Sequence, residues 1–267
     1  MKAVIMAGGL PSIVEGRNNP IPKPMAEIGG EPILYHIMKN YSCQGLDEFI
    51  VCAGYKGDYI KNYFMNYYLY QSDITVDLSS NEVKVHKKET ETWKVTVADT
   101  GRESSIAQRL LRIREFVGEE DFLVTYGDCV SDIDINKLAD QHRQGQKAVT
   151  MAVAIPTGRR RVLPITQEGE LSERVPASHQ FVRTDACTMM FSREIFPYLE
   201  EFCEDDVMSD EFMRRLAHDD QISLYFHEGF WSPMETARDK NYLEQLYEMG
   251  QAPWKNWETE RSGNHHV

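Results

Sequence analysis

The chain has 267 residues, 42% of them hydrophobic, which is enough for one large α/β domain with a sizeable core and argues against wholesale disorder. Its 42 acidic and 29 basic residues give a formal net charge of −13, which argues against a nucleic-acid or membrane partner. Five scattered cysteines without a Cys-x-x-Cys pair argue against disulfides or a zinc site. With no signal peptide or membrane-spanning run in the sequence, we expect a cytoplasmic protein.

Short apolar runs alternate with helical patterns in the first half of the chain. Lys2–Ala7 and Glu48–Ala53 predict strands, and the apolar spacing over Ile33–Tyr41 predicts a helix. The aromatic-rich stretch Tyr59–Tyr70 predicts a second helix. Beyond it we expect a hairpin-rich insertion, built from the segments Ile74–Leu78, Glu82–His86 and Lys94–Ala98.

The alternation continues in the second half. Strands are predicted at Asp121–Tyr126, Ala148–Ile155, Thr188–Phe191 and Ile222–His227. Helices are predicted at Arg109–Val117, Ile135–Gly145, Glu194–Phe202 and Thr236–Met249. The segment Pro156–Pro176 is charged and irregular. The tail from Gln251 to Val267 is polar and expected to be frayed, with Trp254 and Trp257 as the side chains that can dock on the body.

This pattern predicts an α/β fold, namely a Rossmann-like, mostly parallel sheet with helices on both faces and a small β insertion. We expect one domain over residues 1–250 and a C-terminal tail over residues 251–267. Ligands of such sheets bind beyond the carboxyl ends of the strands. Because Gly8-Gly9, Gly127-Asp128 and Trp231–Glu235 all follow predicted strand ends, we expect them to share one rim and to form the site.

Four carboxylates near this rim are candidates for chemistry. Asp128 suits a divalent metal that bridges nucleotide phosphates, although capping of a turn or helix explains it equally well. Glu235 is either a second metal ligand or an acid favoured by the dipole of the following helix. Asp132 and Asp134 directly precede a helix, so capping explains this pair better than metal binding.

Basic groups for an anionic ligand are few in the first loop. Lys23 is held between two prolines and suits a phosphate contact, with an ordinary exposed turn lysine as the alternative. Arg17 is the only basic residue between Gly8 and Lys23. The Arg159-Arg160-Arg161 run is either a solvated loop or the basic patch that an anionic substrate needs.

Six stretches carry a family resemblance: MKAVIMAGGL, PIPKPMAEIGGEPILYHIMKNYS, GLDEFIVCAGYKGDYIKNYF, WKVTVADTG, FLVTYGDCVSDIDI and GFWSPMETARDKNYLEQLYE. From Met1 to about Gly250 the chain resembles the sugar nucleotidyltransferases, in particular the bacterial glucose-1-phosphate cytidylyltransferase branch. The resemblance implies the nucleotide-diphosphosugar transferase fold and the reaction of CTP with α-glucose 1-phosphate to CDP-glucose and pyrophosphate. It also implies Mg²⁺ as cofactor, a nucleotide, sugar phosphate or nucleotide sugar as ligand, and a homo-oligomer.

The resemblance also assigns roles to single residues. It implies catalytic roles for Lys23 and Asp128, and it makes Asp128 the first metal ligand. Glu235 stands where the second metal aspartate belongs, so the acid is kept but lengthened by one methylene. The implied nucleotide contacts are Ala7, Gly8, Gly9, Lys23, Arg109 and Asp128. The implied sugar contacts are Arg174, Asp185 and Glu235.

The chain departs from the family pattern where phosphates are held. In the signature Gly-Gly-x-Gly-Thr-Arg-Leu, Pro11-Ser12-Ile13 stands in place of Gly-Thr-Arg, and Pro11 also removes a backbone donor. Val175 stands in place of the lysine that holds the sugar phosphate. Loss of one transition-state charge contact costs about 10²–10³ in rate, so we expect a nucleotidyltransferase-like protein with weakened or altered activity.

Other readings of these departures stay open. Arg17 or the Arg159–Arg161 run could replace the missing charge in an active enzyme. The chain could instead be a non-catalytic paralogue that binds a nucleotide or nucleotide sugar, or an enzyme repurposed to a different substrate, for which the charge of Asp185 suggests an amino-bearing ligand. A metal-dependent glycosyltransferase that uses Asp132-x-Asp134 is less consistent with the surrounding motifs.

Overall fold

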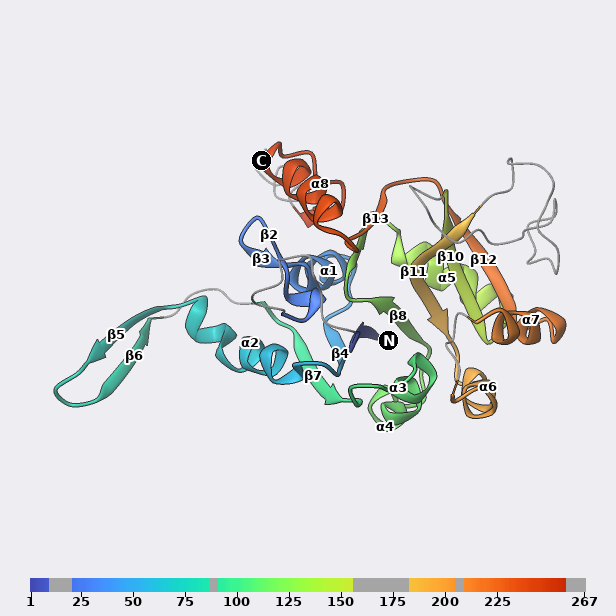
Figure 1. Cartoon of the computed structure of the whole chain (residues 1–267), viewed down its shortest axis with the longest axis horizontal. Coiled ribbons are helices and arrows are strands. Elements are labelled where there is room, and N and C mark those ends of the chain that lie inside the picture. The colour runs from blue at the N-terminus through green and yellow to red at the C-terminus, as the bar shows by residue number, and fades with distance from the viewer. Residues whose placement is uncertain (10–20, 87–90, 156–182, 205–208, 258–267) are drawn as a thin grey trace, which may run out of the picture.

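A computed structural model describes residues 1–9, 21–86, 91–155, 183–204 and 209–257. Its centre is a seven-stranded sheet with the strand order β12-β10-β11-β8-β1-β4-β7 (Figure 1). The strands are β1 (Lys2–Ala7), β4 (Glu48–Ala53), β7 (Lys94–Asp99), β8 (Phe122–Tyr126), β10 (Val149–Ala154), β11 (Thr184–Phe191) and β12 (Ile222–His227). Neighbours are parallel except at β11, which runs antiparallel to β8 and β10. The predicted mostly parallel sheet is confirmed.

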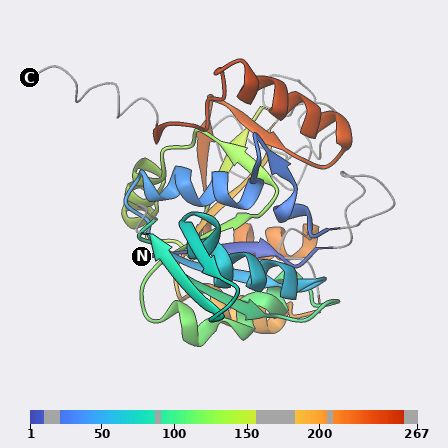
Figure 2. The same ribbon diagram turned by 90° about the vertical axis from the view of Figure 1, so that its left-hand side faces the viewer.

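Helices cover both faces of this sheet (Figures 1 and 2). One face packs against α1 (Ile33–Ser42), α2 (Gly57–Tyr70), α5 (Ile135–Gly145) and α8 (Ala237–Glu248). The other packs against α3 (Ile106–Arg112), α4 (Arg114–Val117), α6 (Ile195–Glu201) and α7 (Asp210–His218). Successive residues of a strand point to opposite faces of the sheet. Because helices cover both faces, the side chains that β1 presents to either face are buried. Burial on both faces explains why these strands are continuous apolar runs in the sequence.

Shorter elements decorate the sheet. A 3₁₀ turn, η1, covers Lys23–Met25. Three antiparallel pairs join β2 (Glu27–Ile28) to β3 (Glu31–Pro32), β5 (Asp73–Asp77) to β6 (Glu82–His86), and β9 (Cys129–Ser131) to β13 (Trp231–Pro233). The β5–β6 hairpin projects from the end of α2, away from the rest of the molecule (Figure 1).

The predicted insertion is smaller than expected. The sequence pattern places Lys94–Ala98 in this insertion, but the segment lies in β7, at the edge of the main sheet and parallel to β4. Val95 and Val97 of this strand pack against the core, and an alternating pattern fits such an edge strand as well as it fits a hairpin. The insertion therefore consists of β5 and β6.

Three further elements differ from the prediction. The helix expected over Arg109–Val117 is two helices, α3 and α4, which meet at Ile113 with φ −97° and ψ 6°. The strand expected at Thr188–Phe191 begins at Thr184. Helix α7 was not predicted, although Ser209 caps it by accepting a hydrogen bond from the backbone N–H of Phe212.

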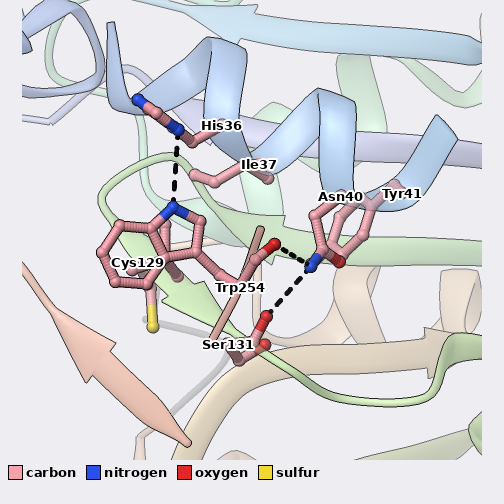
Figure 3. A pocket seen from close by; sticks show the side chains of 8 residues that line it. His36, Ile37, Asn40, Tyr41, Cys129, Ser131 and Trp254 are labelled. Atoms are coloured by element: carbon pink, nitrogen blue, oxygen red, sulfur yellow. Dashed lines mark hydrogen bonds between the residues drawn. The ribbon is translucent and has the colours of Figure 1, made fainter. Parts of the chain in front are cut away.

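The chain after α8 packs on the body as far as the structure describes it. Trp254 is fully buried and stacks on Phe230, with ring centroids 5.5 Å apart. Asn40 Nδ2 donates hydrogen bonds to the carbonyl oxygens of Trp254 (2.8 Å) and Ser131 (3.2 Å) (Figure 3). Docking of Trp254 is therefore confirmed. The expected fraying is wrong for residues 251–257, and the core extends past the predicted boundary at residue 250.

The hydrogen bonds of His36 beside Trp254 require a neutral imidazole. Trp254 Nε1–H donates to His36 Nδ1 at 3.4 Å, and His36 Nε2 lies 2.8 Å from the Ile28 carbonyl oxygen and donates to it (Figure 3). Burial lowers the pKa of His36. A lowered folded-state pKa means that its contribution to stability is complete above the ordinary pKa of about 6.5 and is lost as the pH falls through the folded-state value.

We therefore expect the melting temperature of the wild type to fall more steeply from about pH 7 to about pH 5 than that of His36→Gln. Thermal unfolding of both proteins in a pH series measures this difference. His142, whose pKa is also lowered by burial, is present in both proteins and cancels. Parallel pH profiles would show that His36 does not titrate in this range.

Candidate active site

The strand order creates a topological switch point between β1 and β8. From β1 the chain builds β4 and β7 on one side, and it later places β8 on the other side. Such a switch point, at the carboxyl ends of parallel strands, is where ligands of open α/β sheets bind. Gly8-Gly9 follows β1 and Gly127-Asp128 follows β8, and the Gly127 N–H donates to the Met6 carbonyl oxygen at 2.9 Å. The two segments share one rim, as predicted.

Lys23 reaches this rim through η1. Its Nζ lies 2.8 Å from Asp128 Oδ2, and the two side chains are 29% and 22% exposed. The approach depends on Gly127, because a Cβ there would lie 2.9 Å from Pro24 Cγ. Helix α5 is capped by Asp134, so the helix-capping alternative for Asp128 is not supported.

Glu235 comes to the same rim from the other end of the chain. β13 pairs with β9, and the N–H of Met234 donates to the Asp128 carbonyl oxygen at 2.7 Å, so Glu235 is the next residue beyond that bond. Helix α8 is capped by a capping box of Thr236 and Asp239. Glu235 contributes its backbone N–H, which donates to Asp239 Oδ2 at 3.0 Å, while its side chain is exposed. The cap is thus made by other side chains.

The chemistry of these two acids fits a magnesium ion. No group of three His, Cys, Asp or Glu side chains in the described residues could hold a metal. Magnesium is usually held by one or two carboxylates together with substrate phosphates, and Asp128 with Glu235 supplies such a pair. Two carboxylates alone do not form a closed metal cage, so any metal at this rim would need further ligands.

Asp185 lies at the same rim of the sheet as Asp128. It stands at the start of β11, opposite Val153 near the carboxyl end of β10. Its Oδ1 accepts a 2.8 Å hydrogen bond from the N–H of Cys187, which has a φ of +60°. The Cys187 thiol has a raised pKa because of its hydrogen bond with Cys129, burial, and the charges of Asp185 and Asp128. The raised pKa keeps the Cys187 thiol protonated, so it is a poor nucleophile.

Arg109 lies beneath the glycine loop and is 5% exposed. Its Nη2 donates to the Gly8 carbonyl oxygen at 2.7 Å, and its Nη1 donates to Thr100 Oγ1 at 2.8 Å and to the Gly101 carbonyl oxygen at 2.7 Å. Burial lowers the pKa of the guanidinium. Arg109 therefore ties the end of β1 to the end of β7. The direct nucleotide contact that the resemblance implies for it stays a prediction.

Gly8 and Gly9 provide a matched pair of substitutions. A Cβ at Gly8 would lie 2.0 Å from Arg109 Nη1, whereas a Cβ at Gly9 would meet no atom of the described residues within 4 Å. Overpacking costs about 1–3 kcal/mol, and displacing Arg109 also breaks its hydrogen bonds. We expect Gly8→Ala to lower the melting temperature of the ligand-free protein by roughly 5 °C or more, and Gly9→Ala by about 1 °C or less. Equal melting temperatures would show that Arg109 moves aside without cost.

The neighbouring acids, Asp132 and Asp134, have different roles. Asp134 caps α5 by accepting a 3.0 Å hydrogen bond from the Lys137 N–H, as predicted. Capping is wrong for Asp132, whose Oδ1 lies 3.0 Å from His227 Nε2. Burial alone would lower the pKa of His227, but its hydrogen bonds to Asp132 and to the Phe230 carbonyl oxygen raise it. Asp134 thus caps a helix and Asp132 pairs with a histidine. The metal-dependent glycosyltransferase alternative, which needs both acids as metal ligands, is therefore not supported.

Several predicted site residues lie outside the described residues: Arg174, Val175, Arg17, the Pro11-Ser12-Ile13 loop and the Arg159–Arg161 run. Sequence reasoning missed two anchoring contacts, the packing of Pro24 on Gly127 and the bonds of Arg109 to the strand ends. A glycine directly after a buried strand was the available signal for the first contact. In the described parts of the chain, none of the helices combines the length and apolar character needed to cross a membrane.

Comparisons with known proteins agree with this architecture. The family model for nucleotidyl transferases matches residues 2–162. The chain is 43% identical over 264 residues to the glucose-1-phosphate cytidylyltransferase of Salmonella typhi, covering 97% of this chain and 100% of the relative. It is 35% identical over 264 residues to the probable glucose-1-phosphate cytidylyltransferase of Bacillus subtilis, covering 96% and 100%. The crystal structure of HddC from Yersinia pseudotuberculosis matches with a TM-score of 0.70 at 18% identity, covering 92% and 99%, which supports the fold alone.

Proposed function

Because the chain belongs to the nucleotidyl transferase family, and within it to the sugar nucleotidyltransferases, we propose that it binds CTP and glucose 1-phosphate at the rim between β1 and β8. The contact that carries this proposal is the 2.8 Å pair of Lys23 and Asp128 at the switch point of the sheet. An ammonium group beside a carboxylate at such a switch point supports a site for a phosphate and its counter-ion.

The proposed reaction is an in-line displacement. A phosphate oxygen of glucose 1-phosphate attacks the α-phosphorus of CTP, a new P–O bond forms, the α–β P–O bond breaks, and pyrophosphate leaves. Asp128 and Glu235 would hold Mg²⁺, which, when bound, neutralises phosphate charge. Lys23, which pairs with Asp128 in the free protein, is placed to exchange that carboxylate for a phosphate oxygen.

We further propose that this transfer is slow. Pro11-Ser12-Ile13 and Val175 replace the residues that hold phosphates in the family pattern, and each lost charge contact costs about 10²–10³ in rate. Binding should suffer less than turnover, because the missing charges act most strongly on the transition state. A non-catalytic nucleotide or nucleotide-sugar binder is the second candidate, and the same substitutions favour it.

The test combines turnover and binding. Pyrophosphate release is measured with CTP, glucose 1-phosphate and Mg²⁺, and thermal shifts are recorded with CTP, CDP-glucose and other nucleotide sugars. We expect a thermal shift with at least one of these nucleotides, and pyrophosphate release well below the usual range of enzymes, which is about 1–10³ s⁻¹. Replacing Pro11-Ser12-Ile13 by Gly-Thr-Arg together with Val175→Lys should raise the rate.

The outcomes separate the candidates. Robust release by the wild type would refute slow transfer and leave an active cytidylyltransferase. Binding without release, which the four substitutions fail to restore, would favour the non-catalytic binder. Absence of binding to every nucleotide would refute both. The cytoplasmic location and the absence of a nucleic-acid partner remain predictions.

A further inference from the structure

Three cations lie together where β4 and β7 end. Lys56 lies in the loop after β4, and Arg102 lies in the loop after β7. A Cβ on Gly101 would lie 3.1 Å from Arg112 Nη1, so a guanidinium of α3 also lies against the second loop. The chain has 42 acidic and 29 basic residues, and most of its surface therefore repels anions. This cluster is a candidate anion site in an acidic protein.

The two arginines of the cluster lack carboxylate partners in the described part of the chain. Arg114, which is also exposed, forms an ion pair with a glutamate at 2.8 Å, whereas neither Arg102 nor Arg112 forms an ion pair with a described carboxylate. The nearby Asp99 Oδ1 accepts a hydrogen bond from the N–H of Gly101 at 3.1 Å. Like charges that lie close together repel each other, so an anion bound between them would be stabilising.

One aromatic ring holds two of these cations. The guanidinium carbon of Arg102 lies 5.3 Å from the centre of the Tyr55 ring, and Lys56 Nζ lies 5.8 Å from it. Such cation–π contacts orient side chains that are otherwise flexible. Lys56 also has φ 49° and ψ 41°, a left-handed conformation that costs free energy for a residue with a Cβ. Backbone outliers of this kind cluster at ligand sites, so the conformation of Lys56 supports a ligand here.

The cluster adjoins the glycine loop after β1. Arg109 Nη2 donates to the carbonyl oxygen of Gly8 at 2.7 Å and to that of Arg102 at 3.3 Å, so one nitrogen atom joins the two loops. A Cβ on Gly54, in the loop after β4, would lie 2.9 Å from the Gly8 carbonyl oxygen. The loops after β1, β4 and β7 therefore meet at one place on the rim.

The strand order separates this cluster from the reacting centre of the proposed function. β8 lies on one side of β1, and β4 and β7 lie on the other. Neighbouring strands are about 4.8 Å apart, so β4 lies about 10 Å from β8. Transfer at the α-phosphorus is proposed for the pair of Lys23 and Asp128, at the β1–β8 switch point. The side of β4 and β7 is left for a part of the nucleotide away from that phosphorus.

We propose that Arg102 and Lys56 bind the terminal phosphates of the nucleoside triphosphate. This inference rests on the proposed function, which places the α-phosphorus at Lys23 and Asp128. The two cations supply charge that the first loop lacks, where Ile13 stands in place of the arginine of the family signature. A guanidinium offers several N–H donors to phosphate oxygens, and an ammonium acts as a point charge.

Inorganic tripolyphosphate tests this site, because it has the phosphate chain without a base or a sugar. Calorimetry without Mg²⁺ measures the affinities for tripolyphosphate, CTP and CMP of the wild type, Arg102→Gln and Lys56→Gln. Arg102→Lys keeps the charge, and Arg214→Gln removes an exposed arginine of α7 as the matched control.

We expect Arg102→Gln and Lys56→Gln each to bind tripolyphosphate and CTP about 10-fold more weakly, as for one lost hydrogen bond to a charged group. CMP has no terminal phosphates, so its affinity should stay within about twofold of the wild type. Arg102→Lys should lose less affinity than Arg102→Gln, and Arg214→Gln should bind all three ligands as the wild type does.

The outcomes separate this site from the proposed function. A wild type that binds CTP, with both glutamine variants binding CTP and tripolyphosphate equally well, would refute the site and leave the proposed function in place. Equal weakening of CTP and CMP would also refute it, because the cluster would then contact the base, the ribose or the α-phosphate. Tripolyphosphate binding that both variants weaken, in a protein that does not bind CTP, would keep the anion site and refute the proposed function. A wild type that binds neither ligand would refute both.

Discussion

Asp128→Asn is expected to abolish the magnesium dependence of nucleotide binding and to lower any transfer rate by about 10²–10³. The carboxylate lies at the switch point between β1 and β8, and it is one of the few hard oxygen ligands at this rim. Glu235→Gln should act in the same direction, because Glu235 directly follows the residue whose N–H bonds to the Asp128 carbonyl oxygen.

A split between two conditions distinguishes metal binding from general damage. Asp128→Asn also removes the partner of Lys23, so nucleotide binding without Mg²⁺ should be unchanged or stronger, while binding with Mg²⁺ weakens. Calorimetry in both conditions measures this split. Asp140→Asn removes an exposed carboxylate on α5 and serves as the charge-matched control. If Asp128→Asn and Glu235→Gln both keep the magnesium dependence of the wild type, neither acid holds the metal.

Trp254→Ala is expected to destabilise the protein by about 3–5 kcal/mol and to lower its melting temperature by roughly 10 °C. Trp254 is fully buried, stacked on Phe230 and in edge-to-face contact with His36 at 6.2 Å. The Trp254 carbonyl oxygen accepts a hydrogen bond from Asn40, which holds the backbone of this segment in place. Because the backbone is held, loss of the indole leaves a large cavity.

Thermal unfolding of Trp254→Ala beside Trp257→Ala provides the comparison. Trp257 lies three residues further on and is partly exposed, so its loss should cost much less. A Trp254→Ala protein that melts within about 2 °C of the wild type would show that the segment after α8 adds little to the core.

The sequence alone determined the central strands and the position of the rim. Local composition reveals the central strands, because each is a short apolar run between turn residues and most are buried on both faces. These strands are β1, β4, β8, β10 and β12. Because the carboxyl ends of parallel strands meet at one edge, the expectation that Gly8, Gly127 and Asp128 lie close together followed from strand order in the chain.

The tertiary structure alone decided which side chains meet. Lys23 and Asp128 are 105 positions apart, and Arg109 and Gly8 are 101 apart, so no local pattern links them. Trp254 and its hydrogen-bond partner His36 are 218 positions apart, so the sequence could not identify this contact either. Local periodicity records which face of an element is apolar, whereas the identity of the facing element depends on how the whole chain packs. For that reason the sequence indicated an α/β sheet with a phosphate-binding rim. The packing decided that Arg109 holds the Gly8 carbonyl oxygen at that rim and that Trp254 belongs to the core.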